Sequence, residues 1–147
     1  MSVIKLYTIG FTKKNAKTFF TKLRNAGVTT LIDIRLNNVS QLAGFAKRDD
    51  LIYFLKELCD CNYRHMPDLA PTKEILEAYK KKQINWDEYV RRFSRLIKER
   101  KIEKKISADE LSNACLLCSE PTPEQCHRRL VSEYLKEQLG DIEIKHL

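Results

Sequence analysis

The chain has 147 residues, which is enough for one folded domain, and we expect a single domain over residues 1–147. Hydrophobic residues make up 43% of the sequence and charged residues 32%, so the composition excludes a disordered or fibrous protein. The short apolar run at the start is interrupted by Lys5 and is typical of neither a secretory signal nor a membrane span. We therefore expect a cytoplasmic protein without a membrane partner.

The sequence contains five cysteines, an odd number. A chain of this length can bury enough apolar surface to be stable without disulfide bonds, so a disulfide framework is not expected. Reduced thiols are the expectation for all five cysteines.

β-prone runs in the first half of the chain predict three strands, at 3–9, 29–35 and 63–66. Apolar residues at helical spacing predict two helices between them, around 16–23 and 51–58. Asp33 and Arg35 fall at the far end of the second predicted strand, where their side chains project in the same direction.

The second half of the chain begins with two predicted helices and continues as strand, helix, strand. The predicted helices are 75–79, 86–101 and 122–139, and the predicted strands are 114–118 and 142–146. The run 114–118 is apolar throughout, as expected of a strand that is covered on both faces.

The positive charge is concentrated around the predicted helix 86–101. The formal net charge is +7, and the segment 80–105 accounts for all of it with eleven basic and four acidic residues. On the helix, Arg91, Arg95 and Lys98 project from the side opposite the apolar stripe, so we expect this basic face to be exposed. It can attract nucleic-acid phosphates or acidic lipid surfaces, and the simpler interpretation is a solvated helix face.

The alternation of strands and helices predicts an α/β domain: a mostly parallel five-stranded sheet with helices on both faces and a two-helix excursion between strands 3 and 4. In such sheets ligands bind beyond the carboxyl ends of the strands. Those ends carry the polar segments 10–12, 33–37, 66–69 and 118–128. We expect the functional site at this edge.

The segment 115–129, CLLCSEPTPEQCHRR, contains the highest concentration of reactive side chains. Cys115, Cys118, Cys126 and His127 are residue types that bind tetrahedral zinc. However, residues three apart on a strand point to opposite faces, so Cys115 and Cys118 cannot close on one ion if 114–118 is a strand. Cys115 then fits a small buried core residue.

An anion site is the second interpretation of this segment. The capping box at 122–125, with a proline at the first helical position, predicts a helix that begins near Thr122. The positive end of that helix would favour an anion and the thiolate of Cys126, and Arg128 would clamp a phosphate or carboxylate.

Nine residues are therefore candidates for a site. The candidate catalytic residues are Asp33, Cys118, Glu120, Cys126 and His127. The candidate ligand-binding residues are Gly10, Thr12, Arg35 and Arg128. Plainer interpretations stay open: His127 can be a core histidine hydrogen-bonded under the loop, and Asp33 and Arg35 can pair only with each other.

Six short motifs occur in order along the chain: Tyr7-Thr8-Ile9-Gly10, Ile32-Asp33-Ile34-Arg35, Gly44-Phe45, His65-x-Pro67-x-Leu69, Leu116-Leu117-Cys118-x-Glu120 and Cys126-His127-Arg128. Together they resemble the domain of unknown function 488 family over nearly the whole chain. The resemblance implies a small cytoplasmic α/β domain whose motif residues converge at the strand ends, and it implies no particular activity. Many members follow Ile-Gly with His-Ser, whereas this chain has Phe11-Thr12, so any proton-transfer role of that histidine is absent here.

Our leading hypothesis is an enzyme that acts on a phosphate-bearing or otherwise anionic substrate, related to nucleotides or nucleic acids, without a cofactor. The alternative is a non-catalytic nucleic-acid-binding protein that uses the basic helix 86–101. A zinc-stabilised fold is a third hypothesis.

Overall fold

Five parallel strands form one sheet in the computed structural model, which describes residues 3–38, 44–120 and 122–147. The strands are β1 (Ile4–Gly10), β2 (Thr30–Asp33), β3 (Asn62–His65), β4 (Ala114–Cys118) and β5 (Ile142–His146). Their order across the sheet is β3-β2-β4-β1-β5, and every neighbouring pair is parallel. The predicted α/β fold is confirmed, with a sheet that is parallel throughout.

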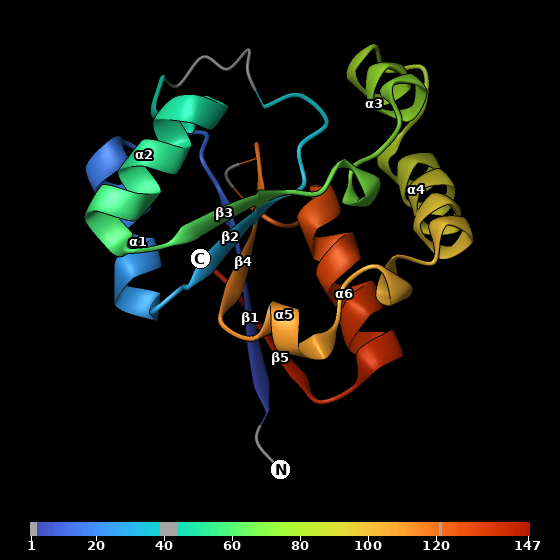
Figure 1. Ribbon diagram of the computed structural model, residues 1–147. Helices are drawn as coiled ribbons and strands as arrows, with labels where there is room; N and C mark the ends of the chain where they lie inside the picture. The colour runs from blue at the N-terminus through green and yellow to red at the C-terminus, as the bar shows by residue number, and fades with distance from the viewer. Residues whose placement is uncertain (1–2, 39–43, 121) are drawn as a thin grey trace.

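Helices cover both faces of this sheet (Figure 1). The helices are α1 (Ala16–Ala26), α2 (Arg48–Cys59), α3 (Lys73–Lys80), α4 (Trp86–Arg100), α5 (Ala108–Leu111) and α6 (His127–Leu139). Short 3-10 helices lie at 44–46, 67–69 and 102–104. The predicted two-helix excursion between the third and fourth strands is present as α3 and α4, with the short α5 added before β4.

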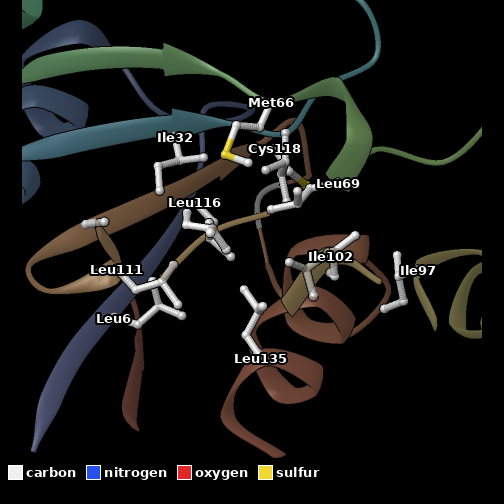
Figure 2. Packing of buried hydrophobic residues seen from close by; sticks show 14 of the residues in the cluster. Leu6, Ile32, Met66, Leu69, Ile97, Ile102, Leu111, Leu116, Cys118 and Leu135 are labelled. Carbon is white, nitrogen blue, oxygen red and sulfur yellow. The ribbon is translucent and has the colours of Figure 1, made fainter. Parts of the chain in front are cut away.

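Side chains of β4 alternate between two cores, one on each face of the sheet. Leu116 belongs to the core under α4, α5 and α6, whereas Leu117 belongs to the core under α1 and α2. Figure 2 shows the first core, in which Leu116 and Ile32 of the sheet face Leu135 of α6. Because both faces are covered, the whole of β4 is buried, which explains its uninterrupted apolar sequence.

Asparagine side chains cap two of the helices. The Asn15 carboxamide oxygen accepts a hydrogen bond from the backbone N–H of Thr18 at 2.8 Å, and that of Asn85 accepts from Glu88 at 2.9 Å. These caps satisfy N–H groups that have no partner within the helix. The predicted start of the long helix at Trp86 is therefore confirmed, with Asn85 as its N-cap residue. Within the described residues, no helix is long and apolar enough to cross a membrane.

The predicted start of the last helix near Thr122 is wrong. Helix α6 begins at His127, with Cys126 as its N-cap residue, and the preceding residues form turns. Gln125, which would close the predicted capping box, instead accepts a hydrogen bond from the Tyr79 hydroxyl at 3.2 Å. A tertiary contact with α3 thus replaces the local cap.

Candidate functional site

A cavity of about 240 Å³ lies at the carboxyl ends of the neighbouring strands β2 and β4. Its wall comes from the residues after β2, from the helix pair α3 and α4, and from residues 118–120 and 125–127. The predicted site residues in its wall are Arg35, Cys118, Glu120, Cys126 and His127. The other predicted residues, Gly10, Thr12, Asp33 and Arg128, are not part of the wall.

Asp33 holds Arg35 in a two-point ion pair directly behind the cavity wall. Arg35 donates from Nε to Asp33 Oδ1 and from Nη2 to Oδ2, both at 2.8 Å, and its backbone N–H also reaches Oδ1 at 3.1 Å. The Tyr63 hydroxyl donates to Asp33 Oδ2 at 2.6 Å. Both members of the pair are buried, with 0% of Asp33 and 2% of Arg35 exposed. Asp33 and Arg35 therefore pair with each other, but not exclusively, because Asp33 also accepts from Tyr63.

Tyr63 is a part of this arrangement that the sequence prediction missed. Tyr63 is on β3, where it pairs with Leu31 of β2. Leu31 lies two residues before Asp33 on that strand. Burial, together with the hydrogen bond to the Asp33 carboxylate, raises the pKa of Tyr63, so the hydroxyl keeps its proton and donates. The Asn38 side chain donates to the same hydroxyl oxygen at 2.9 Å.

One nitrogen of Arg35 is left without a partner. Nη1 is buried and has no hydrogen-bond acceptor among the described residues. The Phe11 ring lies 5.4 Å from the guanidinium carbon and covers one side of it. A buried N–H group normally has a partner. Arg35 lines the cavity, but Nη1 itself has almost no exposed surface, so a ligand oxygen can reach it only by displacing the atoms that cover it.

Cys118 and Cys126 are joined by a disulfide bond in the cavity wall. The prediction that all five thiols are reduced is therefore wrong for this pair, because the end of β4 and the start of α6 bring the two sulfurs together. The other three cysteines are free. Burial raises the thiol pKa of all three, to about 12 for Cys61, which makes them poor nucleophiles.

The zinc set that includes Cys115 is excluded by the strand geometry. Cys115 packs in the core under α1 and α2, whereas Cys118 packs in the core on the opposite face. Cys118, Cys126 and His127 nevertheless lie together, with one potential ligand atom from each within 4.8 Å of the others.

His127 is fixed by a hydrogen bond to the main chain. Its Nε2 lies 2.8 Å from the carbonyl oxygen of Ile34, and its ring meets the Phe93 ring edge-on at 5.7 Å. Since a carbonyl can only accept, Nε2 carries the proton and Nδ1 keeps a lone pair. Burial lowers the pKa of His127 to about 4, so the ring is neutral near pH 7.

Arg128 and Gly10 pack against the backbone of the loop after β4, at the Glu120 carbonyl. Arg128 is 1% exposed and donates from Nε to Thr8 Oγ1 at 3.2 Å and from Nη1 to the Glu120 carbonyl at 2.6 Å. A Cβ atom on Gly10 would collide with that carbonyl and with the Arg128 guanidinium. The backbone N–H of Thr12 donates to Ser119 in the same loop at 3.1 Å. The Glu120 side chain is exposed at the rim of the cavity.

Aromatic residues of α3 and α4 form another part of the cavity wall, which the sequence prediction did not assign to a site. Trp86 and Tyr89 stack with ring centres 5.0 Å apart, and Tyr79 packs against both. Trp86 and Tyr89 belong to the predicted apolar stripe of α4, and nothing in the local pattern distinguishes a stripe that lines a cavity from one that fills a core. We call these three residues the aromatic wall.

A comparison with family models identifies the chain. The model for the domain of unknown function DUF488 matches residues 15–135. The chain belongs to this family. No curated protein and no solved structure matches the chain.

The DUF488 motifs quoted above occupy two different places in the fold. Those around Asp33, Cys118 and Cys126 form the cavity wall or lie directly behind it. The Gly44-Phe45 motif lies on the other side of the sheet, where Phe45 packs against Phe19 of α1 at 5.3 Å. Phe11, which follows the Tyr7-Thr8-Ile9-Gly10 motif, packs against the Arg35 guanidinium.

The basic face of α4 is exposed, as predicted, and lies outside the cavity wall. Part of its charge is already paired on the helix. Glu88 accepts from Arg91 at 2.9 Å and from Arg92 at 2.7 Å, and Arg95 lies 3.6 Å from Glu99. These pairs reduce the field available to a nucleic acid, and the nucleic-acid hypothesis stays a prediction.

Proposed function

We propose that this DUF488 protein is an enzyme whose substrate carries a phosphate or another anionic group, and that the cavity binds this group against Arg35. The observation that carries the proposal is that Nη1 of Arg35, a buried arginine of the cavity wall, has no partner among the residues that the structure describes. An oxygen anion would complete the hydrogen bonding of the guanidinium. Asp33, Tyr63 and Phe11 would hold the guanidinium in place.

The charges around the cavity favour a substrate with one anionic group over a polyphosphate. The Arg35 charge is largely offset by Asp33 at 2.8 Å. At the wall, Lys80 adds one positive charge and Glu120 adds one negative charge. The attraction is therefore short-range, through a charge-assisted hydrogen bond and not through a strong field.

The aromatic wall supports a substrate that also has a planar ring. Tyr79, Trp86 and Tyr89 line the same cavity as Arg35, and aromatic side chains bind flat rings by stacking or edge contacts. A nucleoside monophosphate combines one phosphate with one planar base and serves as the model substrate. This choice keeps the predicted link to nucleotides.

The chemical step is assigned to groups that reach the cavity. With the disulfide reduced, Cys118 or Cys126 supplies a nucleophilic thiol, and the helix N-terminus at Cys126 favours its thiolate form. Glu120 at the rim is the carboxylate placed to exchange a proton with the substrate. Asp33 serves to orient Arg35.

Trp86 is the only tryptophan of the chain, so its fluorescence reports on the cavity. We expect a nucleoside monophosphate to change this fluorescence saturably and the matching nucleoside to bind more weakly. Arg35→Lys keeps a positive charge beside Asp33 but removes Nη1. Loss of a hydrogen bond to a charged group is worth about 1.5–3 kcal/mol, so affinity should fall at least about tenfold.

Arg95→Lys is the matched control, because it makes the same change on an exposed side chain outside the cavity wall. It should bind like the unaltered protein. Far-UV circular dichroism shows whether Arg35→Lys keeps its fold. Equal affinities of a folded Arg35→Lys variant and the unaltered protein would refute anion binding at Arg35.

A further inference from the structure

We propose that the reduced form of the protein binds one zinc ion through Cys118, Cys126 and His127. The three residues lie in the cavity wall, and one potential ligand atom of each is within 4.8 Å of the others. Tetrahedral zinc, with bonds of about 2.0–2.3 Å to nitrogen and sulfur, needs ligand atoms about 3.5–4 Å apart. After reduction of the disulfide, the two sulfurs would have to move apart by side-chain rotation to reach that spacing.

The hydrogen bond of His127 has the arrangement found around metal-bound histidines. A ligating imidazole usually donates its other N–H to a carbonyl or carboxylate, which fixes the ring and directs the lone pair toward the metal. Here Nε2 donates to the Ile34 carbonyl at 2.8 Å, and Nδ1 is left as the ligand atom. The packing of the Phe93 ring against the imidazole holds this orientation.

The two sulfurs can form the disulfide, bind the metal or, in the reduced protein without metal, supply the nucleophilic thiol of the proposed function. A thiol reductant would break the Cys118–Cys126 bond: two reductant thiols become one disulfide, and their two hydrogens pass to Cys118 and Cys126. Zinc would then displace these two protons and bind both thiolates. The oxidised form lacks thiolate ligands, so zinc binding is restricted to the reduced form.

A Cys2His set leaves the fourth position of tetrahedral zinc open, which is typical of catalytic and not of structural sites. Because all three ligands line the cavity, that position faces the same space as Arg35. Water or a substrate oxygen would occupy it. Zinc binding itself does not require an anion at Arg35, so the two proposals can fail separately.

Cobalt(II) and zinc titrations of the full chain test the site, with a phosphine as the reductant because dithiols bind metals themselves. Reduced protein should bind one cobalt ion per chain and show a sulfur-to-cobalt charge-transfer band together with visible bands of tetrahedral cobalt. Zinc should displace the cobalt. The oxidised protein should show none of these signals.

Variants of each ligand complete the test. Cys118→Ser, Cys126→Ser and His127→Gln should each weaken cobalt binding at least tenfold, whereas Cys59→Ser, which changes a cysteine outside the cavity, should bind normally. Arg35→Lys should keep the cobalt spectrum even if it loses the nucleotide. If the ligand variants unfold, the difference in cobalt binding between the reduced and the oxidised unaltered protein still tests the proposal. No cobalt uptake by reduced protein, or an unchanged spectrum in folded His127→Gln, would overturn the proposal.

Discussion

The partly buried His127 makes the stability of the protein depend on pH in a way that one substitution should remove. The histidine has a pKa of 6.5 in the unfolded chain and about 4 in the folded protein. Burial is the main cause, the positive charge of Arg128 acts in the same direction, and the Ile34 carbonyl and the Asp33 charge oppose it. Between these two pH values the unfolded state binds more protons, so the free energy of unfolding falls as the pH falls.

The size of this effect follows from the two pKa values. Each pKa unit corresponds to about 1.4 kcal/mol, so the histidine contributes a loss of up to about 3 kcal/mol between about pH 7.5 and about pH 4. His127→Gln cannot titrate, and its side-chain N–H can still donate to the Ile34 carbonyl. Between these pH values, the free energy of unfolding of the variant should therefore fall by up to about 3 kcal/mol less than that of the unaltered protein.

Urea unfolding at several pH values measures this difference, in protein with the disulfide intact and with a chelator present to exclude metal. Groups such as His146, whose pKa is also lowered, titrate in both proteins and cancel in the comparison. If the free energy of unfolding changed equally with pH in the variant and in the unaltered protein, burial would not hold His127 in its neutral form.

The remaining predictions concern the loop after β4, the support of Arg35 and the basic face. Gly10→Ala should destabilise the protein by about 1–3 kcal/mol in thermal unfolding, because the added Cβ displaces the Glu120 carbonyl, and an unchanged melting temperature would contradict the observed packing. Tyr63→Phe should lower the free energy of unfolding by about 1.5–3 kcal/mol, because Asp33 loses a hydrogen-bond donor. A urea midpoint equal to that of the unaltered protein would refute the support of Asp33 by Tyr63. Alanine at all three positions of the basic face should leave nucleotide binding at Trp86 unchanged, whereas a parallel loss of oligonucleotide affinity and salt dependence would favour the nucleic-acid hypothesis.

The strands were predictable because their signals are local. The segments 114–118 and 142–146 appear as predicted, since an apolar or alternating run between polar turns has few other solutions. The convergence of Arg35, Cys118 and His127 also followed from the rule that parallel strands place their carboxyl ends at one edge.

What the sequence did not reveal depends on contacts between distant segments. The helix start at His127 reflects the pairing of Gln125 with Tyr79, which lies 46 positions earlier in the chain. The disulfide requires the end of β4 to lie beside the start of α6. The support of Asp33 by Tyr63 requires both the adjacency and the register of β2 and β3. Periodicity within one segment contains none of this information.

The aromatic wall shows the same limit for the site. Trp86 and Tyr89 follow the helical spacing of a core stripe, and α4 indeed buries Phe93 and Ile97 from that stripe. The first turn of α4 lies at the edge of this core and also lines the cavity, and Tyr79 of α3 packs against it. The positions at which neighbouring helices and strands end decide which part of an apolar helix stripe fills a core and which part lines a cavity.

Anomalous diffraction from crystals soaked in an arsenate-bearing analogue of a nucleoside monophosphate tests the central claim most directly. Our account predicts an anomalous peak within hydrogen-bond distance of Arg35 Nη1, with the base against the aromatic wall. It would be contradicted by a cavity that stays free of the analogue while the peaks lie on surface lysines, or by Nη1 bonded to a protein acceptor that closes the cavity.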